Sequence, residues 1–339
     1  MIKRILLVLA VVLVGTLFYY RDLVHYGVVQ GKGQLSIVWN AKPVSEFLDN
    51  SGTPDSIKQK LLFIAEVRKF AIDELGLNDT DNYTTIYDQK GKPILWVVTG
   101  CEPFAFNPKI WTFPVVGEMP YKGFFIEEMA YDEMAEVEEA GYDVGLRTVG
   151  GWSTLGWFKD PILSNMLGRS YGDLANLIIH ELVHATVFVK DSVDFNENLA
   201  SFIGDRGAEL FLQKYYADTH LLEYENELRD EQIYISHILR GADALDSLYR
   251  SFAADASVPK KIALKREMIE KVVVSMDTLS LSSTSFLSKI KGRDLNNTYF
   301  MSFLRYRSKQ MSLEDLFVNE FNGDLNAFIQ DMKEKYPFL

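Results

Sequence analysis

A short stretch at residues 180–200, HELVHATVFVKDSVDFNENLA, holds side chains of the types that bind metals and move protons. His180 and His184 are four positions apart, so on a helix both imidazoles point from one face toward the same ion. In such HExxH sites the metal lowers the pKa of a water, and the intervening glutamate takes its proton and passes it to the leaving amine. The stretch therefore predicts a hydrolytic metal site with Glu181 as the general base.

A catalytic zinc site needs a third protein ligand, and Glu197 is the leading candidate. The polar segment 190–194 can turn the chain, and Asp194 can cap a second helix that begins at Phe195. Glu197 would share one face of that helix with four small residues, Ala200, Ser201, Gly204 and Ala208. Such a face lets the second helix pack closely on the first, which the glutamate needs in order to reach the ion. Zinc is the expected metal, because two histidines and a carboxylate suit it.

Other interpretations of these residues stay open at the level of sequence. DFNE also fits a capping box, in which Glu197 would bond the backbone of Asp194. The apolar flanks of HELVH also fit a buried core helix whose polar groups only satisfy one another. Asp205 and Glu209 are alternative carboxylate ligands, and Ser201 or Asp205 could hydrogen-bond the histidines.

The elements that must position this site can be predicted from periodicity. Residues 54–77 have the apolar spacing of a helix that Gly76 ends. Residues 83–115 are β-branched and aromatic around a KGKP turn, which predicts a small antiparallel sheet. An acidic helix is expected at 125–141, followed by a strand near residue 143. From about Ser170 the pattern is helical, with breaks near Gly204, Asp218, Pro259, Gly292 and Gly323.

These elements predict an α+β fold with a single domain over residues 22–339. Residues 22–169 would form a mixed lobe with the small antiparallel sheet, and residues 170–339 a mainly helical lobe that carries HExxH. The metal site would lie between the two lobes. The chain has 339 residues, of which 47% are hydrophobic, and this is enough to bury a substantial core.

Residues 1–21 predict a signal or anchor helix. Lys3 and Arg4 precede an uncharged apolar run from Ile5 to Tyr20, which would span about 24 Å at about 1.5 Å per residue. We expect a retained membrane anchor that places the catalytic domain on the periplasmic side, because cations before such a run stay in the cytoplasm. A cleaved signal peptide and a buried soluble helix are the alternatives.

Composition excludes several classes of protein. The net charge is −12 and there is no run rich in Lys or Arg, which argues against a nucleic-acid partner. Cys101 is the only cysteine, so an intrachain disulfide framework and a cysteine-rich zinc module are excluded. The sequence gives no indication of oligomeric state.

The ligand motif carries a family resemblance. HExxH followed on a second helix by NExxA (Asn196, Glu197, Ala200) resembles the gluzincin metallopeptidases, which have a zincin-like fold. The segment 185–196 between His184 and Glu197 is shorter than in the thermolysin pattern. Segments 33–43, 152–167, 174–212 and 295–306 are similar to a bacterial family of predicted aminopeptidases.

The resemblance implies a zinc-dependent peptidase, with His180, His184 and Glu197 as ligands and Glu181 as base. We therefore expect a membrane-anchored zinc aminopeptidase that acts on peptides. A zinc endopeptidase, a non-peptide amidohydrolase and a non-catalytic zinc-binding protein on a peptidase fold are the alternatives.

Further site residues are expected on the same grounds. A donor to the developing oxyanion is needed, and Tyr306 is the first candidate, followed by His220 and His237. Glu118 is a candidate for recognising the amino terminus of the substrate. The glycine-rich stretch 150–153 could run along a substrate backbone or could form a plain turn.

Overall fold

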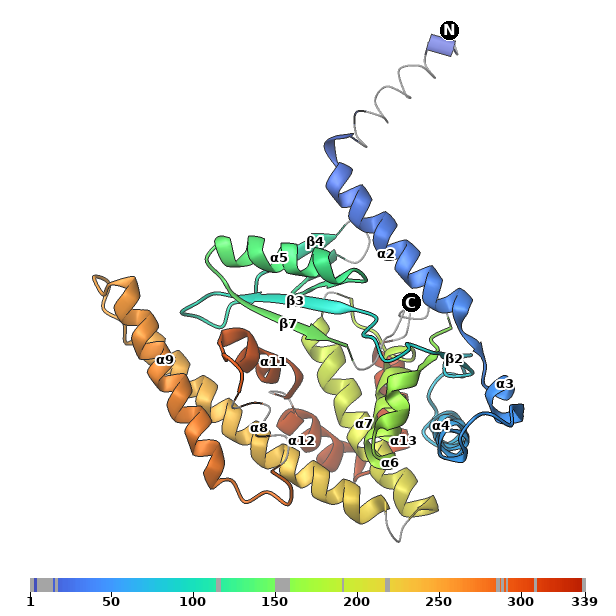
Figure 1. Cartoon of the computed structure of the whole chain (residues 1–339). Coiled ribbons are helices and arrows are strands. Elements are labelled where there is room, and N and C mark those ends of the chain that lie inside the picture. Colours follow the sequence, from blue (N-terminus) through green and yellow to red (C-terminus); the bar gives the residue numbers. More distant parts are fainter. Residues whose placement is uncertain are drawn as a thin grey trace.

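The computed structural model describes residues 3–4, 15, 18–113, 117–149, 159–190, 192–216, 220–284, 287, 290, 292–307 and 310–336, without the side chains of residues 306, 307, 310 and 311. Most of the expected anchor therefore lies outside the described residues, and within them no helix is long and apolar enough to cross a membrane. The helix that follows, α2 (Arg21–Asn40), projects from the body at its N-terminal end (Figure 1). Its C-terminal part buries Ile37, and the hydroxyl of Tyr26 donates to the carbonyl of Gly123.

Two helices form the centre of the molecule. These are α6 (Tyr171–His184) and α7 (Val193–Tyr215), which lie side by side in Figure 1. The hydroxyl of Ser170 caps α6 by accepting from the backbone N–H of Asp173, which satisfies one of the free donors of the first turn. Burial of α6 on nearly all sides explains why its sequence is apolar all round.

The described strands form three small sheets. In the first, β2 (Thr85–Tyr87) pairs antiparallel with β1 (Lys42–Pro43) and parallel with β8 (Ile162–Leu163). The second has the order β6 (Lys122–Phe124), β3 (Trp96–Cys101) and β7 (Asp143–Thr148), all antiparallel. The third pairs β4 (Trp111–Phe113) with β5 (Gly117–Met119).

The turn expected at KGKP is present, but the two strands that flank it do not pair with each other. Lys90 and Gly91 do make a turn with positive φ, but the strands on either side of it, β2 and β3, belong to different sheets. The local pattern located both strands correctly. It could not identify the partner of β2, because β8 lies far along the chain and pairs in parallel.

Helices cover both sides of the second sheet. The expected acidic helix is present as α5 (Glu127–Glu139) and packs on one side, while α11 (Asn297–Arg307) lies on the other (Figure 1). The acidic face of α5 is exposed, and its apolar face buries Ala130 and Val137 against Val98 and Phe124. This amphipathic division explains how so acidic a segment forms part of a core.

The remaining helices are α3 (Val44–Asp49), α4 (Asp55–Asp73), α8 (His220–Arg250), α9 (Val258–Ser275), α12 (Gln310–Phe321) and α13 (Leu325–Lys335), with short 3-10 turns at Ser164–Gly168 and Met276–Thr278. The breaks expected near Pro259 and Gly323 are confirmed. Pro259 lies in the first turn of α9, where its missing N–H costs nothing, and Gly323 has a φ of +78° between α12 and α13. The break expected at Gly204 is wrong, because α7 continues through it.

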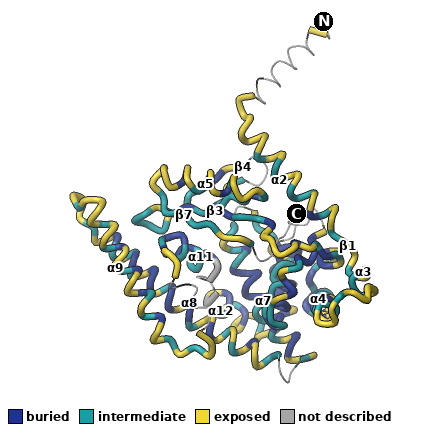
Figure 2. The backbone as a smooth tube through the Cα atoms, viewed as in Figure 1, coloured by how far each residue is buried: buried dark blue, intermediate teal, exposed yellow. Residues whose placement is uncertain are grey.

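The largest core cluster surrounds α6 and α7, where Figure 2 shows the buried backbone concentrated (Figure 2). Within it, Phe63 of α4 packs edge to face on Phe211 of α7, and Phe70 of α4 packs on the same ring at a tilt of 56°. A second cluster joins α8, α9 and α11. The site-bearing helices therefore lie within the largest core cluster of the described residues.

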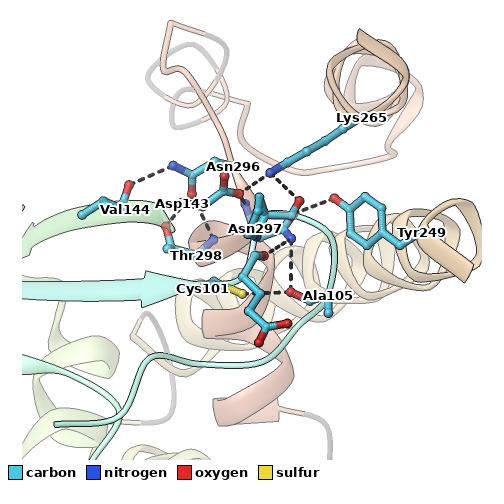
Figure 3. Close-up of polar contacts among 11 residues, drawn as sticks. Cys101, Ala105, Asp143, Val144, Tyr249, Lys265, Asn296, Asn297 and Thr298 are labelled. Carbon is cyan, nitrogen blue, oxygen red and sulfur yellow. Dashed lines mark hydrogen bonds and ion pairs between the residues drawn. The ribbon is translucent and has the colours of Figure 1, made fainter. Parts of the chain in front are cut away.

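A buried polar network fastens the second sheet to the helices (Figure 3). The carboxylate of Asp143, at the start of β7, accepts from the ammonium of Lys265 and from the backbone N–H of Asn297, at 2.8 Å for the latter. The side chain of Asn297 accepts from the hydroxyl of Tyr249 at 2.7 Å and donates to the carbonyl of Glu102 at 2.9 Å. β7, α8, α9 and α11 are thus held together by groups that satisfy one another.

Candidate metal and catalytic site

Three side chains from α6 and α7 converge on one point. The Nε2 atoms of His180 and His184 are 3.1 Å apart, and the Oε2 atom of Glu197 lies 3.6 Å from the first and 3.7 Å from the second. In a tetrahedral zinc site with bonds of about 2.0–2.1 Å, neighbouring donor atoms are about 3.3 Å apart. The three donors therefore have the separations of a metal site, and they could hold one ion between them.

The three side chains are also nearly excluded from water. His184 is 9% exposed, and His180 and Glu197 are each 17% exposed. Burial alone would raise the pKa of Glu197, but the two imidazoles lower it below its usual range. Burial likewise would lower the pKa of His184, and the carboxylate of Glu197 raises it. Glu197 is thus an ionised, acceptor-only group facing two imidazole nitrogens, which is the donor chemistry that zinc prefers.

Close packing of the two helices brings the ligands together. A Cβ atom on Gly204 of α7 would lie 3.3 Å from the Cβ of His180 and 3.3 Å from the carbonyl oxygen of Asn176. One turn later, a Cβ on Gly207 would lie 3.1 Å from the side chain of Ile179. The expected small-residue face is confirmed, and it explains why a glycine occurs in the middle of a long helix.

Glu197 does not cap its own helix. The N-cap of α7 is Ser192, which makes no side-chain cap bond, and Asp194 already lies in the first turn. The capping box expected as an alternative is therefore excluded, since Glu197 lies beyond the first turn and its carboxylate faces the histidines. The start of this helix was expected at Phe195 and is earlier, at Val193.

Sequence reasoning missed the residue that fixes the loop between α6 and α7. The carboxamide of Asn196 accepts from the backbone N–H of Val189 at 2.9 Å and donates to the carbonyl of the same residue at 2.8 Å. This pair of bonds closes the loop just before Glu197. The only signal in the sequence was the residue type, because an asparagine that becomes buried needs partners for both halves of its amide. In the structure Asn196 is 6% exposed.

Glu181 lies next to His180 on α6 but is not one of the three converging ligands. Its negative charge acts on His184 and also on the phenol of Tyr83. It is thus close to the site while leaving its carboxylate outside the ligand set, as a general base requires.

The alternative carboxylates do not converge on the histidines. Asp205 accepts from the side chain of Asn176 at 2.6 Å, and Glu209 pairs with Arg206 at 3.4 Å. Ser201 is buried within α7. Within the described residues, the metal-type cluster consists of His180, His184 and Glu197.

The expected oxyanion donors have other surroundings. The ring of His220 lies tilted against that of Tyr171, with centroids 4.2 Å apart, and the Nε2 atom of His237 lies 2.9 Å from the carbonyl oxygen of Val272. Neither histidine is part of the cluster of His180, His184 and Glu197. Tyr306 is on α11, but its side chain lies outside the described part of the chain.

Two candidates for substrate binding came from the sequence. Glu118 is exposed on β5, and the glycine-rich stretch 150–153 lies outside the described residues. Glu118 is not part of the cluster of His180, His184 and Glu197. Both remain predictions from sequence.

The comparison with protein families decides the kind of protein. A family model with the description "Putative aminopeptidase" matches residues 25–336. The chain belongs to this family. Membership of the aminopeptidase family supports peptidase activity with a peptide as substrate, and it confirms the resemblance to a bacterial aminopeptidase family. The resemblance to the gluzincins stays a prediction from sequence. No curated protein and no solved structure matches the chain.

Proposed function

We propose that this aminopeptidase-family protein is a zinc-dependent peptidase that removes residues from the amino terminus of peptides. His180, His184 and Glu197 are its metal ligands, and Glu181 is its general base. The observation that carries the proposal is the convergence of two imidazole nitrogens and one ionised carboxylate within 4.8 Å, beside a glutamate that is not part of the ligand set.

A bound zinc ion supplies a Lewis acid that acidifies water and polarises a carbonyl group. Glu181 accepts a proton from the attacking water while the water oxygen forms its bond to the carbonyl carbon. Glu181 then donates this proton to the amide nitrogen as the C–N bond breaks. The products are a carboxylic acid and an amine, and Glu181 is again a carboxylate. One water is consumed for each bond cleaved.

The proposal includes a zincin-like arrangement, in which a mixed lobe and a helical lobe flank the ligands. It also includes an anchor over residues 1–21 that holds the site outside the cytoplasm. The apolar run from Ile5 to Tyr20, preceded by Lys3 and Arg4, supports the anchor.

The test is mass spectrometry of a mixed peptide pool after incubation with the zinc-loaded full chain. The matched control is the same protein with a chelator. Loss of single N-terminal residues that stops with the chelator supports the aminopeptidase. Internal cuts would make the protein a zinc endopeptidase, and intact peptides would overturn the peptidase proposal in favour of non-peptide hydrolysis or zinc binding alone.

Two variants separate the base from the metal. Glu181→Gln should retain zinc and lose turnover, because an amide cannot accept the proton of water at neutral pH. Glu209→Gln on α7 is the matched control and should keep both properties, because this carboxylate pairs with Arg206 instead of the ligands. Full turnover in Glu181→Gln would overturn the assigned role.

A further inference from the structure

Tyr83 carries a hydroxyl that the fold does not explain. The residue is 3% exposed, and its hydroxyl oxygen is buried without a hydrogen-bond partner among the described residues. A buried hydroxyl that has lost its water and gained no partner costs free energy. A phenylalanine at this position would fill the same space without that cost. The hydroxyl is therefore not retained for stability.

The backbone at Tyr83 is also unusual. Its φ is +63°, a region that aromatic residues rarely adopt. In this conformation the N–H of Tyr83 donates to the carbonyl of Asp160 at 2.7 Å. The side chain of the preceding Asn82 exchanges two bonds with Asp160, at 3.0 Å with its N–H and 3.3 Å with its carboxylate. A fully buried aspartate is thus hydrogen-bonded to the strained tyrosine and to the residue before it.

Residues 78–83, which lead to Tyr83, are hydrogen-bonded to the residues that directly follow α6. The backbone N–H of Asn78 donates to the hydroxyl of Thr186 at 3.0 Å, and its side chain donates to the carbonyl of Ala185 at 3.4 Å. Tyr83 belongs to the core cluster that contains Leu182 and Val183 of α6. The segment that leads to this strained, unpartnered tyrosine is therefore hydrogen-bonded to the residues that directly follow α6, the helix that carries Glu181.

The charge of Glu181 also acts on the phenol of Tyr83. Burial raises the pKa of the Tyr83 phenol well above its usual value, and the negative charges of Glu181 and Asp160 raise it further. The phenol thus stays protonated at all working pH values and can only act as a donor toward a carboxylate.

We propose that Tyr83 is a positioning residue for Glu181, whose carboxylate accepts a hydrogen bond from the Tyr83 hydroxyl when the site is engaged. The inference rests on the proposed function. A hydroxyl–carboxylate bond is among the stronger hydrogen bonds in proteins, and catalytic hydrogen bonds often tighten only in the complex with substrate. The bond directs one oxygen of Glu181 to the tyrosine and the other to the attacking water.

The test uses Tyr83→Phe in the full chain, with kcat, KM, zinc content and Tm measured together. We expect kcat to fall by about 10- to 100-fold, as is typical when a partner of a site residue is removed. KM and zinc content should stay at the wild-type values. Tm should equal or exceed that of the wild type, because the substitution removes a buried group that has no partner.

Tyr249→Phe is the matched control. Tyr249 is also buried, at 7% exposed, but its hydroxyl donates to Asn297 in the network that joins α8 to the second sheet. This variant should show the opposite pair of effects, a lower Tm and an unchanged kcat. A Tyr83→Phe protein with wild-type kcat, or with a reduced Tm, would overturn the positioning role.

A double-mutant cycle tests whether Tyr83 acts through Glu181. Glu181→Asp keeps a carboxylate and hence a measurable rate, but shortens its reach. If Tyr83 positions Glu181, adding Tyr83→Phe to Glu181→Asp should reduce kcat by much less than it does in the wild type. Independent, multiplicative losses would mean that the hydroxyl contacts the substrate, and would overturn the inference. Absence of metal-dependent cleavage by the wild-type protein would instead overturn the proposed function itself.

Discussion

The carboxamide of Asn196 makes two hydrogen bonds with the main chain of Val189, one in each direction. Because Val189 lies beyond the end of α6 and Asn196 lies in the first turns of α7, these bonds close the loop between the two ligand-bearing helices. Glu197 is the next residue. The closure therefore accounts for how a short linker brings a carboxylate to within 3.7 Å of both histidines.

Asn196→Ala should weaken zinc binding by about 10- to 100-fold, as for other residues that orient metal ligands. It should also lower the free energy of unfolding by about 1–3 kcal/mol, because two backbone groups lose their partner. Zinc competition with a chromophoric chelator and urea denaturation measure the two effects. Asn319→Ala, at an exposed position of α12, is the control. Wild-type zinc affinity in Asn196→Ala would limit the asparagine to a role in folding.

Substitutions in the ligand set should identify the residues that bind zinc. His184→Ala and Glu197→Gln should each lose bound zinc, because two remaining donors do not complete a site. Metal analysis of the purified proteins measures this directly. Glu181→Gln and Asp205→Asn should keep one zinc per chain. Retention of zinc by Glu197→Gln together with loss by Asp205→Asn would transfer the third ligand to Asp205.

Much of this site could be predicted from sequence because helical spacing is a local property. His180 and His184 lie on one face of any helix that contains both, and the small residues after Glu197 predict a close helix contact. The contact itself turns Gly204 from an expected helix break into a packing residue. A glycine in sequence has both meanings, and only the neighbouring helix decides between them.

Features that depend on distant partners could not be predicted. The parallel pairing of Ile86 with Ile162 joins segments that share no local pattern. Tyr83 has a positive φ and donates its N–H to the carbonyl of Asp160, which is far away in the sequence. The residue type of Tyr83 does not predict this backbone conformation. In each case the long-range contact overrides the local preference.

Gly204→Ala should destabilise the protein. The added Cβ would lie 3.0 Å from the side-chain oxygen of Asn176 and 3.3 Å from its carbonyl oxygen, and the helix backbone cannot easily move away. Overpacking of this kind costs about 1–3 kcal/mol, which exceeds the gain of at most about 1 kcal/mol from the helix propensity of alanine. Thermal unfolding measures the difference.

The control for this substitution is Gly31→Ala, in the interior of α2, where a Cβ meets nothing within 4 Å. Its Tm should equal or exceed the wild-type value. Zinc affinity should fall in Gly204→Ala alone, since only this change separates the helices that carry His180 and Glu197. An unchanged Tm for Gly204→Ala would show that α6 and α7 can separate freely.

Asp143→Ala should lower the free energy of unfolding by about 3–5 kcal/mol, because it leaves the buried ammonium of Lys265 without its carboxylate. The side chains of Lys265 and Asp143 are only 9% and 16% exposed. The substitution also removes the acceptor for the N–H of Asn297. Urea denaturation followed by circular dichroism measures the loss.

Two further variants separate the charge of Asp143 from its hydrogen bonds. Asp143→Asn keeps an acceptor for the N–H of Asn297 but removes the charge, so its stability should lie between those of Asp143→Ala and the wild type. Glu267→Gln breaks a fully exposed pair with Lys271 and should leave stability unchanged. Wild-type stability in Asp143→Asn would mean that the carbonyl of Pro103, which accepts from Lys265 at 2.9 Å, is a sufficient partner for the ammonium.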